Sequence, residues 1–282
     1  MLFRSKIEAK CYASLGSIFE SQGEYVKAKE HSEKALAIAE KIGDRETEAT
    51  CYARLGSIFE SQGEYVKAKE HSEKARAIAE KIGDRETEAK CYASRGCIFV
   101  SQGEYVKAKE HYEKALAIAE KIGDAKIEAE CYGTLGCIFV SQGEYVKAKE
   151  HSEKALAIAE KTGDRKIEAK CYASLGSIFE SQGEYVKAKE HSEKAVAIAE
   201  KIGDRKIEAT CYASLGSIFE SLGKYVKAKE HSEKALAIAE KIVDRKIEGS
   251  LMSTYARKYI FEAPAKVIRS LRHPPKSQSK PR

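Results

Sequence analysis

The chain repeats itself every 40 residues, and this periodicity constrains its fold more than any other feature. The segment Cys-Tyr-Ala-Ser-Leu-Gly-Ser-Ile-Phe recurs with small changes, and so does Gly-Glu-Tyr-Val-Lys-Ala-Lys-Glu-His. The cysteine that opens the first segment stands at positions 11, 51, 91, 131, 171 and 211. A fixed period of this length predicts a stacked array, in which each unit buries its apolar side against its neighbours.

Each repeat reads as a pair of helices, as residues 44–83 illustrate. Asp44 can cap a helix that we expect from Arg45 to about Ser61, because its carboxylate can accept bonds from the free amides of the first turn. Gln62-Gly63 interrupts the pattern, and Gly83 is suited to end a second helix. Apolar residues recur at helical spacing in both segments: Cys51, Tyr52, Leu55, Ile58 and Phe59, then Tyr65, Ala68, Ala75, Ile78, Ala79 and Ile82.

These residues resemble a known family. The pattern Tyr12-x-x-Leu15-Gly16-x-x-Phe19, followed by Ala28 and Ala35, is similar to the tetratricopeptide repeat, with tyrosine in place of the usual tryptophan. The long second helix resembles the repeats of the LGN/Pins spindle-orientation adaptors and of tetratricopeptide repeat protein 28-like proteins. The resemblance implies a right-handed superhelix whose first helices line a concave groove, and a protein that holds peptides or partner domains rather than an enzyme.

The chain departs from the family pattern in two ways. The aromatic residue in the middle of the second helix is serine in five repeats and is restored only at Tyr112, and the terminal proline is absent. We therefore expect looser packing than in typical members.

The expected fold is an all-α solenoid of six tetratricopeptide-repeat hairpins plus a C-terminal capping helix. The array spans residues 1–243, with repeats at about 4–43, 44–83, 84–123, 124–163, 164–203 and 204–243. A degenerate first helix at 244–263 would cap the last core face. Residues 264–282 are basic and contain prolines, and we expect them to be disordered.

Comparison of the repeats with one another suggests a binding site in the middle of the groove. Four columns of the first helices vary at spacings of three or four residues, which places them on one face. Where other repeats carry Ser and Glu, the two central ones carry Cys97, Val100, Cys137 and Val140. An apolar centre with polar surroundings is typical of binding interfaces. The alternative is drift in a repeat that was later duplicated. The expected polar residues of this site are Lys90, Glu130, Arg54, Glu60 and Glu180.

Two arginines break the core pattern, because Arg76 and Arg95 stand where other repeats carry leucine or valine. Either their stems carry the charges out to solvent or to nearby glutamates, or they create a weak joint between the second and third repeats.

Recurring histidines lie one helix spacing apart, too far to share a zinc ion, and we expect a solvated face there: His31, His71, His111, His151, His191 and His231.

Other classes of function find little support. The sequence contains no Walker loop, no Gly-x-Ser-x-Gly and no His-Glu-x-x-His, so we expect no enzyme, cofactor or metal. The net charge of +6 equals the formal charge of residues 264–282 alone, so nucleic acid could contact only the tail. No apolar run is long enough to span a membrane, and we expect a cytoplasmic protein with reduced cysteines.

The predicted function is a non-enzymatic scaffold that binds a peptide or helix of a partner protein. The alternative is a structural or self-associating array with a basic tail that contacts acidic partners.

Overall fold

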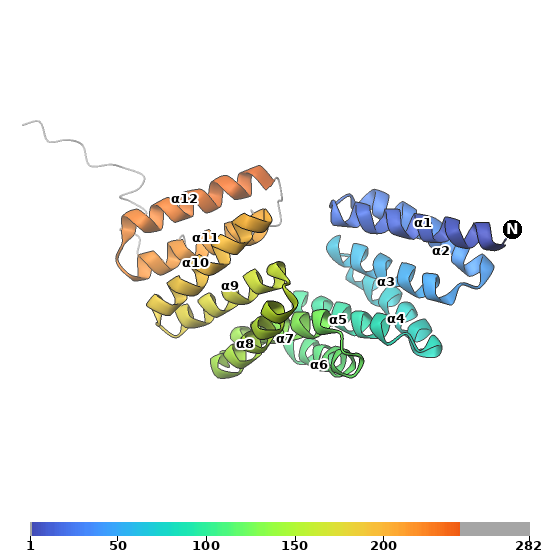
Figure 1. The fold of residues 1–282 in the computed structure, drawn as a ribbon, viewed down its shortest axis with the longest axis horizontal. Coiled ribbons are helices and arrows are strands. Elements are labelled where there is room, and N and C mark those ends of the chain that lie inside the picture. Colours follow the sequence, from blue (N-terminus) through green and yellow to red (C-terminus); the bar gives the residue numbers. More distant parts are fainter. Residues whose placement is uncertain (1, 243–282) are drawn as a thin grey trace, which may run out of the picture. The chain divides into compact units, whose positions relative to one another are not determined.

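The computed structural model describes residues 2–242, so the expected capping helix at 244–263 and the tail at 264–282 lie outside the described residues. Within this range the chain forms helices and no strands, as the sequence predicts (Figure 1). The helices are α1 Leu2–Ser21, α2 Tyr25–Ile42, α3 Arg45–Ser61, α4 Tyr65–Ile82, α5 Arg85–Ser101, α6 Tyr105–Ile122, α7 Ala125–Ser141, α8 Tyr145–Thr162, α9 Arg165–Ser181, α10 Tyr185–Ile202, α11 Arg205–Ser221 and α12 Tyr225–Ile242.

Recurring caps set the boundaries of the helices. In the second repeat, the Thr47 amide donates to Asp44 Oδ1 over 3.3 Å, which satisfies one free donor at the start of α3. Gly83 follows α4 with φ of 74°. This left-handed conformation carries no steric penalty for glycine, and the amide of Asp84 then bonds back to the Ala79 carbonyl. Gly-Asp pairs at 43–44, 83–84, 123–124, 163–164 and 203–204 repeat these caps between successive hairpins, which keeps equivalent positions in register.

The two helices of a hairpin touch backbone to backbone where glycine faces serine. A Cβ atom added to Gly56 would lie 3.3 Å from the Ala68 carbonyl oxygen and 3.4 Å from the Ser72 amide nitrogen. Ser72 is 1% exposed. Serine in place of an aromatic ring lets the helices approach closely at this contact, and looser packing than in typical members stays a prediction. In the third repeat, Gly96 instead makes room for the ring of Tyr112.

The described helices belong to two compact units, residues 1–174 and the part that begins at Leu175, and the division falls inside α9. In the first unit, each second helix packs against the first helix of the next hairpin: α2 on α3, α4 on α5 and α6 on α7. The first helices α1, α3, α5 and α7 also touch in sequence. One core cluster joins Leu55, Phe59 and Ala68 to Ile98, with Leu36 packed against it. Apolar contacts therefore hold hairpins together as well as helices within a hairpin.

Burial of equivalent residues depends on their place in the array. Leu55 and Ile58 of α3 are 1% and 0% exposed, because α2 covers them. Their counterparts in α1, Leu15 and Ile18, are 38% and 51% exposed, since no described helix covers that side of α1. Ile82, which the sequence pattern places in the core, is 42% exposed at the end of α4.

Candidate partner-binding face

The candidate site lies on one face of the first helices, which we call the first-helix stripe. It comprises the four columns that begin at Lys10, Ser14, Ser17 and Glu20 and recur every 40 residues. The intervals of three or four residues place these positions on one side of each helix. Because α1, α3, α5 and α7 touch in sequence, their stripes form one continuous surface in the first unit.

Hydrogen bonds between serine and glutamate side chains join neighbouring first helices across this surface. Ser57 Oγ of α3 donates to Glu20 Oε1 of α1 over 2.7 Å, and Ser94 Oγ of α5 lies 3.4 Å from Glu60 Oε2 of α3. In the second unit, Ser217 Oγ donates to Glu180 Oε1 over 2.5 Å. The recurring glutamates Glu60 and Glu180, expected as contacts for a partner, therefore also bind the next repeat.

Arg54 is occupied within the array. Its guanidinium donates to the Ala13 carbonyl of α1 and lies 3.5 Å from Glu20 Oε2. The side chain is only 14% exposed. The arginine, which the sequence suggests as a polar residue of the site, thus joins the first two hairpins and has little surface left for a partner.

Cys97, Val100, Cys137 and Val140, which we call the central patch, lie on the neighbouring helices α5 and α7. Val100 and Val140 are half-buried and Cys137 is exposed, with its Sγ atom 3.6 Å from Ser174 Oγ. Cys97 is half-buried. The four side chains thus stand on adjoining helices of one unit, and Cys137 is the most accessible of them.

Charged residues of the stripe lie on the same two helices. Lys90 is exposed on α5 and pairs with Glu86 one turn earlier, with Nζ 2.5 Å from Oε1. Glu130 is exposed on α7. The structure therefore groups Lys90 and Glu130 with the central patch on one unit, whereas Glu180 belongs to the other unit.

Tyr112 is a contributor that the sequence comparison did not assign to the site. Its hydroxyl lies 2.7 Å from Cys97 Sγ, and the residue is 2% exposed. Burial raises the pKa of the Cys97 thiol, and the Glu60 carboxylate raises it further. A signal was present in the sequence, because Tyr112 interrupts the serine column in the same repeat in which Cys97 replaces serine. Cys97 is thereby tied to the hairpin interior.

The histidines are half-buried, so the expected solvated face is only partly correct. Each ring for which both contacts are described is half-buried between a tyrosine and a phenylalanine of its own hairpin. The His71 ring centroid, for example, lies 5.9 Å from that of Tyr52 and 5.0 Å from that of Phe59. Burial, with Arg95 and Lys114 nearby, lowers the pKa of His111 to about 4. These rings are packing elements.

Residues 2–242 lack two features that would indicate other functions. No cluster of three or more His, Cys, Asp or Glu side chains is arranged to hold a metal ion in this part of the chain. No helix there combines the length and the apolar character that crossing a membrane requires.

A family model for the tetratricopeptide repeat matches residues 9–81, 53–121, 96–161 and 167–241. The chain belongs to the tetratricopeptide repeat family. The matched segments cover most of the described helices, so the resemblance inferred from Tyr12, Leu15, Gly16 and Phe19 is confirmed at the level of the family. No curated protein matches the sequence.

Solved structures share the fold at low sequence identity. BtubC from P. vanneervenii is 19% identical, with 86% of this chain and 92% of that chain covered and a TM-score of 0.60. A Rap protein complexed with competence and sporulation factor is 18% identical, covering 83% and 75%, with a TM-score of 0.65. A putative kinesin light chain with nearly identical repeats from Podosopora anserina is 20% identical, covering 68% and 95%, with a TM-score of 0.52.

Proposed function

We propose that this chain is a non-enzymatic scaffold that binds a peptide or helix of a partner protein on its first-helix stripe. The tetratricopeptide-repeat fold is typical of such proteins, and a similar structure is a Rap protein complexed with competence and sporulation factor. As part of this proposal, the repeats are of the long type found in LGN/Pins or tetratricopeptide repeat protein 28-like adaptors, and the protein is cytoplasmic.

The observation that carries the proposal is the change of chemistry at the central patch. Between α1 and α3, Glu20 and Ser57 form a charge-assisted hydrogen bond. At the equivalent positions of α5 and α7 stand Val100 and Cys137, which cannot make that bond. Apolar surface that is covered by a partner contributes about 25 cal/mol per Å². A partner's aliphatic or aromatic side chain would therefore gain most at the central patch.

The surrounding charges complete an arrangement that is common in interfaces. Lys90 and Glu130 are exposed beside the apolar residues, and Glu60 is half-buried on α3. A polar rim around a small apolar centre orients the ligand while the centre contributes most of the affinity. We therefore expect a ligand with one apolar anchor residue and polar neighbours of mixed charge.

A displayed library of random peptides tests this proposal. The native chain would be used for selection, and a variant with Cys97→Ser, Val100→Glu, Cys137→Ser and Val140→Glu for comparison. These changes copy residues that other repeats carry at the same positions, so circular dichroism should show an unchanged helix content. We expect selected peptides to share an apolar residue and to bind the variant at least about tenfold more weakly, a loss of about 1.4 kcal/mol.

A matched control carries the same two added charges elsewhere. Val66 and Val106 are 74% and 68% exposed at the starts of α4 and α6, away from the stripe. The double variant Val66→Glu, Val106→Glu should bind the selected peptides like the native chain. Equal binding to the native chain and the quadruple variant would reject the central patch as the anchor site.

Self-association is the second candidate function, and the bare side of α1 favours it. Ile7, Leu15 and Ile18 are 48%, 38% and 51% exposed there. The equivalent side of α3 packs against α2, so this apolar surface matches one that the chain itself buries at each internal joint. Light scattering distinguishes this candidate, because molar mass should rise with concentration and the rise should disappear in Leu15→Lys, Ile18→Lys.

A further inference from the structure

The joint between α4 and α5 differs chemically from the other joints of the first unit. Arg95 of α5 occupies the position of Leu55 in α3 and Leu135 in α7, which are each 1% exposed. Arg76 of α4 occupies the position of Leu36 and Leu116, which are half-buried. Two facing apolar side chains are therefore replaced by two cations at this single joint.

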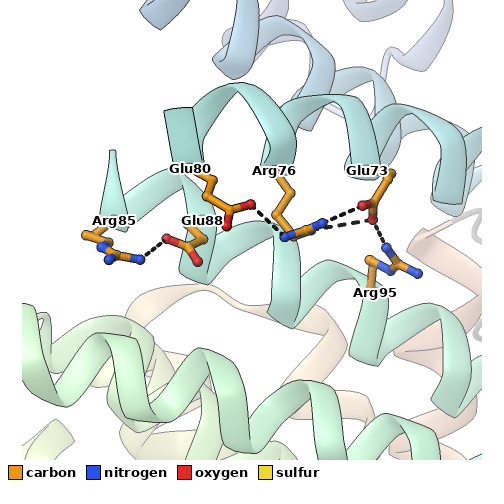
Figure 2. A network of polar contacts seen from close by, with 6 residues as sticks. All are labelled: Glu73, Arg76, Glu80, Arg85, Glu88 and Arg95. Atoms are coloured by element: carbon orange, nitrogen blue, oxygen red, sulfur yellow. Dashed lines mark hydrogen bonds and ion pairs between the residues drawn. The ribbon is translucent and has the colours of Figure 1, made fainter. Parts of the chain in front are cut away.

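One glutamate binds both arginines (Figure 2). Arg76 Nη2 donates to Glu73 Oε1 over 2.6 Å, and Arg76 Nη1 reaches Glu80 Oε2 over 3.1 Å. Arg95 Nη1 of the neighbouring helix donates to Glu73 Oε2. The expectation that the stems carry their charges to nearby glutamates is thus confirmed. Figure 2 also shows Arg85 paired with Glu88 farther along, a contact within α5 that does not bridge the joint.

The network leaves one buried N–H group, that of Arg95 Nε, without a hydrogen-bond acceptor. Arg95 Nε is buried and has no hydrogen-bond partner, although the side chain as a whole is 23% exposed. Burial also lowers the pKa of this guanidinium. A buried donor without a partner keeps its desolvation cost, whereas the leucines at this position carry none. The ion pairs replace apolar packing but do not reproduce it.

The joint has also lost a recurring hydrogen bond. At other joints of the first unit, a tyrosine of the first helix donates to a glutamate near the end of the preceding second helix. Tyr52 reaches Glu40 over 2.8 Å, and Tyr132 reaches Glu120 over 3.0 Å. Tyr92 makes no such bond to Glu80 in the described structure, because Glu80 pairs with Arg76. In its place the Arg76 guanidinium makes a cation–π contact with the Tyr92 ring, 5.7 Å from the ring centroid.

We propose that the α4/α5 joint is the place where the first unit opens, with helices α1 to α4 detaching and unfolding together while the part that begins at α5 stays folded. The stability of a repeat array depends on its nearest-neighbour contacts, so the joint with the weakest contact opens first. Here charged contacts replace leucine packing, a buried donor is unpaired and the tyrosine–glutamate bond is missing. Opening also separates Ser94 from Glu60, so it reshapes the first-helix stripe next to the central patch.

Hydrogen exchange, resolved by helix, tests this proposal without any knowledge of a ligand. In the native chain, α3 and α4 should exchange in the same step as α1 and α2, and before α5 to α8. Arg76→Leu with Arg95→Leu restores the residues of the other joints, so the fold should persist. It should slow exchange in α3 and α4 at least about tenfold. Added salt should speed exchange in the native chain and have less effect in the double variant.

A single substitution with a matched control isolates the shared carboxylate. Glu73→Gln removes the carboxylate that Arg95 binds and one of the two that Arg76 binds, and should speed exchange of α3 and α4. Glu113→Gln changes the equivalent glutamate of α6, which faces no arginine at its joint and should leave exchange unaltered. The proposal is overturned if α3 and α4 exchange together with α5 to α8 in the native chain. It is equally overturned if the double leucine variant leaves their exchange unchanged.

Discussion

The different burial of equivalent residues predicts different costs for one and the same substitution. Leu15 and Leu55 occupy equivalent positions, one in α1 and the other in α3, but are 38% and 1% exposed. Replacing Leu55 by alanine removes a fully buried side chain and leaves a cavity between α2 and α3, which should cost about 2–5 kcal/mol of unfolding free energy. Alanine preserves the helix, because its helix propensity is at least that of leucine.

Leu15→Ala should cost much less. Full burial of a leucine side chain is worth about 1.5–3 kcal/mol, and somewhat more than half of the residue's surface is removed from water at position 15, so about 1–2 kcal/mol is at stake. Water can enter the space on the bare side of α1, so no closed cavity adds to this cost. The expected difference between the two variants is about 1–3 kcal/mol.

Urea unfolding followed by circular dichroism, at two protein concentrations, measures this difference. Equal costs in dilute protein would refute the argument, because Leu15 would then be as well covered in solution as Leu55. A cost for Leu15→Ala that grows with protein concentration would instead support self-association through α1. Leu135→Ala serves as a control, since Leu135 is also 1% exposed and should behave like Leu55.

Two further predictions concern titration and thiol chemistry. Because the pKa of His111 is lowered to about 4, the neutral form is favoured on folding, and its contribution is present above the unfolded pKa of about 6.5 and is lost as pH falls toward 4. On acidification the His111→Gln variant should therefore lose about 1 kcal/mol less unfolding free energy than the native chain, after allowance for solvent screening of a half-buried ring. Urea unfolding at several pH values would detect this difference. Cys137 is exposed whereas burial raises the pKa of half-buried Cys97, so Cys137 should react with a thiol reagent at least about tenfold faster. Mass spectrometry of partly labelled protein measures the ratio, and faster labelling of Cys97 would contradict the described burial.

Much of the fold could be predicted because its signals are local. Asp44 and Gly83 mark helix ends through hydrogen bonds with residues a few positions away, and apolar spacing identifies the faces that pack. The candidate site was less predictable, since its residues act across helices. Variation between repeats drew attention to the central patch, but it did not reveal that Arg54 is occupied by Ala13 and Glu20 or that Cys97 contacts Tyr112.

The sequence by itself determined that the chain is an array of helical hairpins, because a 40-residue period, recurring caps and helical spacing are properties of neighbouring residues. Only the tertiary structure decided what identical residues do. Leu15 and Leu55 have nearly the same local sequence, but α2 covers one and no described helix covers the other. In the sequence, Arg95 is a charged residue at a core position, and only the structure shows that Glu73 of the preceding hairpin binds it. Burial and ion pairing depend on which helix comes to lie alongside, and local sequence does not encode that.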